Sequence, residues 1–124
     1  MDFTFTEDQL LFQSSVREFL TAEVTPARIR ASWETGGGRD PALWRQLADM
    51  GLAGLTVPEE FGGIGADYLY DVVVFEELWR VGTSGPGFLI HTDLVASYIL
   101  AFGTDEQKQQ WLPKMVTGEA IGSL

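Results

Sequence analysis

Residues 6–24, TEDQLLFQSSVREFLTAEV, contain the clearest fold signal in the chain. Thr6 and Gln9 form a capping box, in which the hydroxyl and the amide side chain can each satisfy a backbone N–H at the start of a helix. Apolar residues follow at helical spacing up to Val24. Pro26 is expected to end this helix, with some continuation possible as far as Trp33.

Two more helices are predicted before residue 82. Asp40 followed by Pro41 is typical of a helix start, and Gly51 is the expected end, after a glycine break at residues 36–38. Residues 52–65 combine short apolar stretches with Pro58, Gly62, Gly63 and Gly65, which indicates an ordered loop. The pattern of residues 67–80 is helical again, although the valine run at 72–74 also fits a strand.

The last third of the chain predicts two further helices. A Gly-Pro-Gly turn at residues 85–87 precedes the apolar stretch 88–102, which is expected to be a helix buried on most sides. A second capping box, Thr104 with Gln107, opens a helix that Pro113 should kink or restart. Residues 1–124 are therefore expected to form one all-α domain, a bundle of about five helices with short connections.

Composition excludes several classes of function. The formal net charge is −10, with 8 Lys and Arg scattered among 18 Asp and Glu, so a basic surface for nucleic acid is not expected. The chain has no Cys, which excludes disulfides and thiolate chemistry. It shows neither an apolar run long enough for a membrane span nor a recognisable targeting segment. We therefore expect a soluble, bacterial cytoplasmic protein.

No catalytic group of residues stands out. His91 is the single histidine, and Asp93 cannot orient it from the same helix face, so His91 is interpreted as a core or cavity-lining residue. Adjacent helical carboxylates point in different directions, which favours solvated or capping roles over a paired acid and base. That interpretation covers Glu59, Glu60, Asp71, Glu76 and Glu77.

Two other patterns have structural interpretations. The loop FGGIG at residues 61–65 lacks a following Lys-Ser/Thr and is followed by Asp67, so a tight turn is favoured over a phosphate site. Phe75 and Trp79 stand at helical spacing and are interpreted as core rather than as a cofactor stack.

Read in order, seven segments resemble the N-terminal domain of the acyl-CoA dehydrogenase family. They span essentially the whole chain, and two of them, PEEFGG and GTDEQK, are jointly a strong signal. The segments are FTEDQL (5–10), LADMGL (47–52), VPEEFGGIG (57–65), FEEL (75–78), FGTDEQK (102–108), LPKM (112–115) and GE (118–119).

This resemblance implies a function that the chain would share with regions beyond it. In the family, an all-α N-terminal domain precedes a β-domain and a second α-bundle, and FAD binds largely between those later parts. A carboxylate base removes the α proton of an acyl-CoA while the β hydrogen passes to the flavin as hydride. Electron transfer flavoprotein as electron acceptor and a homotetramer for the full-length enzyme are further family expectations.

The same resemblance places the N-terminal domain at one wall of the acyl cavity, which should be apolar. The candidate acyl-contacting residues lie after the Gly-Pro-Gly turn, and the alternative is that they are bundle core. They are Phe88, Leu89, Thr92, Leu94 and Val95.

The chain stops at Leu124, before the β-domain of a relative would begin. Catalytic and cofactor-binding residues are therefore expected outside it, and the chain alone should neither bind FAD tightly nor dehydrogenate a substrate. The apolar end favours a portion of a flavin-dependent dehydrogenase, or of an acyl-CoA oxidase or flavin monooxygenase on the same scaffold. The alternative is a free-standing helical protein-interaction module. Acyl chain length and the choice between dehydrogenase and oxidase stay open.

Overall fold

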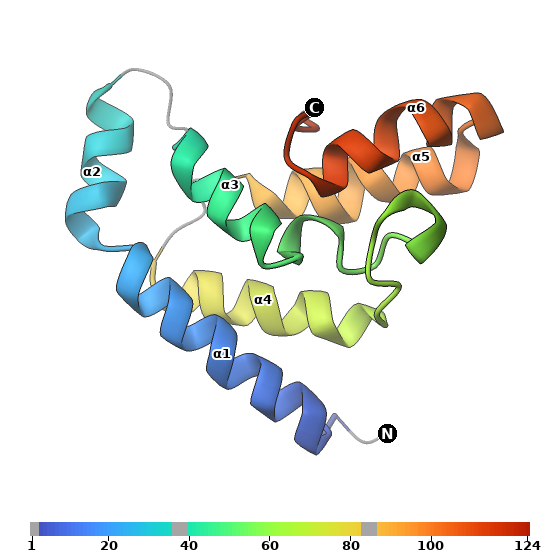
Figure 1. Ribbon diagram of the computed structural model, residues 1–124. Helices are drawn as coiled ribbons and strands as arrows, with labels where there is room; N and C mark the ends of the chain where they lie inside the picture. The colour runs from blue at the N-terminus through green and yellow to red at the C-terminus, as the bar shows by residue number, and fades with distance from the viewer. Residues whose placement is uncertain (1–2, 36–39, 83–86) are drawn as a thin grey trace.

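The computed structural model describes residues 3–35, 40–82 and 87–124, and all regular secondary structure in these ranges is helical (Figure 1). The glycine break at 36–38 and the first part of the Gly-Pro-Gly turn lie outside the described residues. The α-helices are α1 (Glu7–Glu23), α2 (Pro26–Glu34), α3 (Pro41–Asp49), α4 (Tyr68–Arg80), α5 (Ser97–Phe102) and α6 (Asp105–Val116). Two 3₁₀ turns, η1 (Leu52–Gly54) and η2 (Glu59–Phe61), and the π-helix η3 (Ile90–Ala96) complete the order.

Both predicted capping boxes are present. The Thr6 hydroxyl accepts a hydrogen bond from the Gln9 backbone at 3.2 Å, and the Gln9 side chain accepts one from the Thr6 N–H at 3.0 Å. Thr104 and Gln107 repeat this arrangement at the start of α6, at 3.3 and 2.9 Å. The starts of α1 and α6 are thus determined by local chemistry.

The first helix ends before Pro26, as predicted, whereas Pro113 does not divide the last helix. Pro26 is the first residue of the separate helix α2, and Thr25 caps that helix by accepting a hydrogen bond from the Arg28 backbone. A proline at the first helical position loses no hydrogen bond, so α2 can begin where α1 ends. Pro113 lies inside α6, which continues through it to Val116 without ending or restarting.

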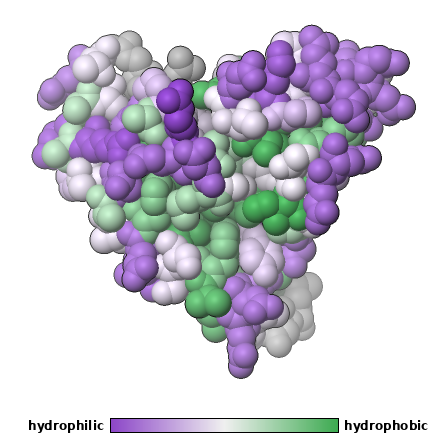
Figure 2. Space-filling model, viewed as in Figure 1, coloured by the Kyte–Doolittle hydropathy of each residue, from purple (hydrophilic) through white to green (hydrophobic). Residues whose placement is uncertain are grey.

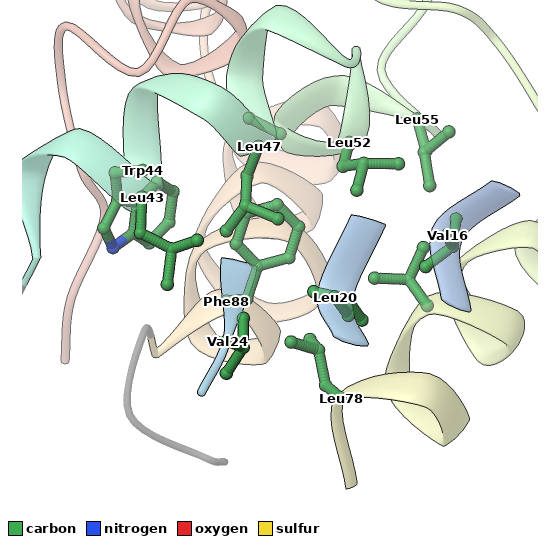
Figure 3. Close-up of a cluster of buried hydrophobic side chains, with 12 residues drawn as sticks. Val16, Leu20, Val24, Leu43, Trp44, Leu47, Leu52, Leu55, Leu78 and Phe88 are labelled. Atoms are coloured by element: carbon green, nitrogen blue, oxygen red, sulfur yellow. The ribbon is translucent and has the colours of Figure 1, made fainter. Parts of the chain in front are cut away.

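The main core lies between α1, α3 and α4. Val16 and Leu20 of α1, Leu47 of α3 and Val74 of α4 are fully buried, and Leu52 of η1 closes the cluster from the loop. Figure 3 shows Leu20, Leu47 and Leu52 in one cluster with Phe88, which follows α4 in the chain. This packing holds the start of η3 against the bundle.

The loop at residues 52–65 is ordered, as predicted. The backbone N–H groups of Gly62, Gly63 and Gly65 all donate to carbonyl oxygens within the same loop. A Cβ added at Gly63 would lie 1.9 Å from the carbonyl oxygen of Val57, so the chain approaches itself there more closely than any other residue allows. The loop therefore forms a tight structural turn.

A second, smaller cluster joins the loop to the arm made of η3, α5 and α6. Val57 and Phe61 of the loop pack with Ala96, Leu112 and Met115. The arm extends away from α1 and α4 (Figure 1). In the same view, hydrophilic residues cover its α6 end, while hydrophobic residues reach the surface below it (Figure 2).

Within residues 3–35, 40–82 and 87–124, none of the helices combines the length and the apolar character that crossing a bilayer requires.

Candidate functional site

The five candidate acyl-contacting residues lie on one turn-and-helix segment, but in different environments. Phe88 is 2% exposed and packs on Trp44, with ring centroids 5.0 Å apart. Thr92 is 3% exposed, and its hydroxyl donates to the Phe88 carbonyl oxygen at 3.0 Å. These two side chains belong to the interior, which corresponds to the core alternative.

The other three candidates face outward or into a groove. Leu89 and Leu94 are 45% and 38% exposed. Val95 is partly buried and contacts the second cluster. These residues flank or belong to η3, and π-helical segments occur frequently at functional sites. Leu89 and Leu94 thus present apolar side chains at the surface of this segment.

An apolar groove of about 580 Å³ adjoins this segment between α5, α6 and residues 120–123. Its volume falls within the usual range of ligand pockets, and aromatic and aliphatic side chains dominate its lining. Tyr98, Phe102 and Trp111 remain exposed at its edge, and the rings of the first two lie 5.8 Å apart. Of the five candidates, Val95 alone lines it.

The sequence had indicated that residues 88–102 are buried on most sides, and this is wrong for the second half. The helix α5 has no buried residue, and Tyr98 and Phe102 are 61% and 80% exposed. The unbroken apolar pattern was the signal that could have suggested a binding surface, but the same pattern is typical of core helices. Apart from Val95, the groove residues were therefore missed.

His91 is a core residue, as predicted. Its ring is fully buried, Nε2 lies 3.1 Å from the Met115 carbonyl oxygen, and Nδ1 accepts the Gly122 N–H at 3.0 Å. A carbonyl can only accept, so Nε2 carries the proton and the ring is neutral. Burial lowers the pKa of His91, because the charged form would lose solvation.

The interpretation of the carboxylates is confirmed for Glu59, Glu60 and Glu76, which are exposed, and wrong for Asp71 and Glu77. Asp71 is 1% exposed, and burial raises its pKa to about 7. Asp93, whose carboxylate accepts the Tyr68 hydroxyl at 3.1 Å, also has a raised pKa because of burial. Asp71 and Asp93 thus form a titratable pair between α4 and η3.

Glu77 is 2% exposed and accepts two hydrogen bonds from Arg17 of α1, at 2.7 and 2.9 Å. The bonds from Arg17 lower the pKa of Glu77. The pair ties α1 to α4 and leaves neither group available for chemistry.

The interpretation of Phe75 and Trp79 as core is half right. Phe75 packs against the main cluster, whereas Trp79 is 67% exposed. Leu78, the residue before Trp79, is buried. Neighbouring residues of a helix point in different directions, so a core position and a surface position can be adjacent in the sequence.

Several groups that could hold an anionic ligand are already engaged within the described residues. The glycine-rich loop uses its N–H groups for its own turn, so it offers no cradle for a pyrophosphate. Arg17 and Arg28 are both engaged in ion pairs with carboxylates. Within the described part of the chain, no group of three or more His, Asp or Glu residues could hold a metal ion.

Comparisons with known proteins match this fold and these motifs to one family. Residues 6–119 match the family model for the acyl-CoA dehydrogenase N-terminal domain. The chain is 38% identical over 120 residues to the mitochondrial long-chain specific acyl-CoA dehydrogenase of Rattus norvegicus, covering 97% of this chain and 27% of that protein. It therefore spans less than a third of that relative's length.

Solved structures agree. An acyl-CoA dehydrogenase from Geobacillus kaustophilus is 40% identical with a TM-score of 0.86, over 98% of this chain and 31% of that one. An acyl-CoA dehydrogenase complexed with FAD from Bacillus anthracis is 27% identical with a TM-score of 0.84, over 94% of this chain and 20% of that one. FAD is thus a cofactor of the family. The chain belongs to the acyl-CoA dehydrogenase family and corresponds to its N-terminal helical domain.

Proposed function

We propose that residues 1–124 supply one wall of the acyl-binding cavity in a flavin-dependent acyl-CoA dehydrogenase, whose flavin-binding and base residues lie outside this chain. The observation that carries the proposal is the outward display of Leu89 and Leu94 beside the π-helix η3. An acyl tail is apolar and gains free energy when it leaves water for such a surface. When bound, FAD supplies the redox chemistry of the reaction.

The geometry narrows the candidate contacts. Leu89, Leu94 and Val95 can meet an acyl chain directly, because their side chains are at least partly open. Phe88 and Thr92 lie in the interior behind these residues, where Phe88 packs on Trp44 and holds the segment in place. The chain's own contribution is therefore to bind the acyl tail and to exclude water from it.

Partners and location follow as proposals from the family. The acyl-CoA thioester is the substrate, electron transfer flavoprotein accepts the electrons, and the full-length protein is a homotetramer in the bacterial cytoplasm. An acyl-CoA oxidase or flavin monooxygenase on the same scaffold would instead pass electrons to oxygen. The free-standing interaction module is not favoured, since the relatives are flavin enzymes.

The first experiment measures the intact mass of the native polypeptide in its source cells with an antibody against this segment. A mass several times 13.7 kDa supports the proposal. A mass near that value overturns it, and the search would turn to a partner protein.

The second experiment tests the wall itself in the native flavoenzyme, by flavin reduction with dodecanoyl-CoA under anaerobic conditions. We expect Leu94→Ser to raise KM roughly tenfold, since about 1.4 kcal/mol of apolar contact corresponds to a factor of ten. Leu11→Ser, an exposed leucine on α1, is the matched control and should leave KM unchanged. Equal KM values for the two variants would contradict a role for Leu94.

A further inference from the structure

The first turn of α4 meets the π-helix η3 through two carboxyl groups. Asp71 is 1% exposed, and its Oδ2 has no hydrogen-bond partner among the described residues. Asp93 lies opposite on η3, where its Oδ2 accepts the Tyr68 hydroxyl. The inference drawn from this contact does not depend on the function proposed above.

A buried carboxylate oxygen without a donor is strongly unfavourable. A proton on that oxygen removes the charge and converts the acceptor into a donor. The Asp93 carboxyl is the acceptor at hand, because it bonds to Tyr68, three residues from Asp71 on the same turn of α4, and because its charge raises the pKa of Asp71. Two carboxyl groups can share a hydrogen bond only when one of them holds a proton.

We propose that Asp71 and Asp93 share one proton and form a latch that holds η3 against α4 while the proton is bound. When Asp71 releases this proton to solvent, two negative charges face each other, one of them on the buried side chain of Asp71. Their repulsion and the desolvation of the second charge then favour separation of η3 from the first turn of α4. The latch therefore links pH to the position of the π-helix.

Among the groups at this contact, Asp71 and Asp93 are the ones whose change of charge matters most near neutral pH. Thr56, from the loop before η2, hydrogen-bonds to Asp71 and lowers its pKa, but the effect of burial is larger. The helix α1 packs along α4, and its Arg17 forms an ion pair with Glu77. Tyr68 contributes a phenol whose pKa is raised by Asp93, so it stays protonated near neutral pH.

The direction of the pH effect follows from the folded-state pKa of Asp71, which burial raises to about 7. An aspartate in the unfolded chain has a pKa near 3.9. The stabilising contribution of the shared proton is therefore fully present below about pH 4 and is lost as the pH rises through 7. The latch opens near neutral pH.

The test is a carboxyl ¹³C NMR titration of the 124-residue chain from pH 4 to 9, with amide shifts recorded for residues 90–96. We expect one carboxyl of the pair to titrate near pH 7, together with the η3 amides. Asp71→Asn, whose amide can donate to Asp93 at any pH, should abolish both changes. At pH 8.5 it should protect the η3 amides from hydrogen exchange at least tenfold better than the wild type does.

Glu76→Gln is the matched control, because Glu76 is an exposed carboxylate on the same helix. It should leave the titration and the η3 shifts as in the wild type. The proposal is overturned if Asp71 titrates near pH 4, or if the η3 amides shift equally in Asp71→Asn. If Asp71→Asn does not fold, the wild-type titration decides alone.

Discussion

The two apolar clusters of this molecule contain the same kinds of side chain but differ in how they are covered. The main cluster is enclosed by α1, α3, α4 and Phe88, so side chains such as Leu20 and Leu47 are fully buried. The second cluster has Leu112 at its centre but leaves Phe102 and Trp111 exposed beside the groove. Apolar content alone therefore does not decide whether a helix becomes core or binding surface. The deciding factor is the number of helices and turns that pack around that helix.

The largest expected effect comes from the enclosed cluster. Trp44→Ala should lower the free energy of unfolding by about 3 to 5 kcal/mol, because Trp44 is 2% exposed and supports both Phe88 and His91. Urea unfolding followed by circular dichroism measures this. Trp79→Ala removes the same side chain from an exposed position and should cost roughly 1 kcal/mol or less. Similar losses for the two variants would show that the main cluster is not closed.

A smaller effect is expected where the two clusters are joined. His91 is neutral and its pKa is lowered by burial, so its contribution is complete above about pH 6.5, the unfolded value, and falls as the pH drops through the lower folded value. The loss is at most about 1.4 kcal/mol per pH unit. The contribution of Asp71 to stability increases as the pH falls over part of this range. The effect of His91 is therefore measured in the Asp71→Asn variant.

In that background, unfolding free energies measured from pH 7.5 to 5 should decrease with falling pH. The additional substitution His91→Gln should flatten the profile. A slope that persists in the double variant would mean that another group titrates there.

The smallest effect on stability is expected at the open groove. Phe102→Ser should change the unfolding free energy by less than about 0.5 kcal/mol, since Phe102 is 80% exposed. It should, however, reduce the fluorescence of the dye ANS bound to the chain, because part of the groove lining is lost. Phe3→Ser, at a residue equally exposed but outside the groove, should leave dye binding unchanged. A large loss of stability in Phe102→Ser would mean that the groove is closed.

Local chemistry made much of the fold predictable. Capping boxes at Thr6 and Thr104 and the N-cap Asp40 mark helix starts whose hydrogen bonds involve residues three positions away. The role of Pro26 was harder to predict, because a proline can mark the end of one helix or the start of the next. The hydrogen bond that the Thr25 side chain accepts shows that Pro26 begins α2.

The candidate site was predictable only in part. The family resemblance led to the segment after the Gly-Pro-Gly turn as a candidate, but the sequence could not separate Phe88, which is interior, from Leu89, which is exposed. Adjacent residues of a helix point in different directions, so the answer depends on which face the bundle covers. The π-helical winding of η3 shifts these faces further from the α-helical expectation.

The sequence by itself determined the all-α class, the helix starts, the ordered loop at residues 52–65 and the family, because these depend on contacts between near neighbours or on motif order. Only the tertiary structure decided that Asp71 and Glu77 are buried and that the groove beside α5 is open. Glu77 is buried because Arg17, 60 residues earlier, meets it across α1 and α4. Such a partner cannot be read from the local pattern, since burial is set by what the rest of the chain places on that face.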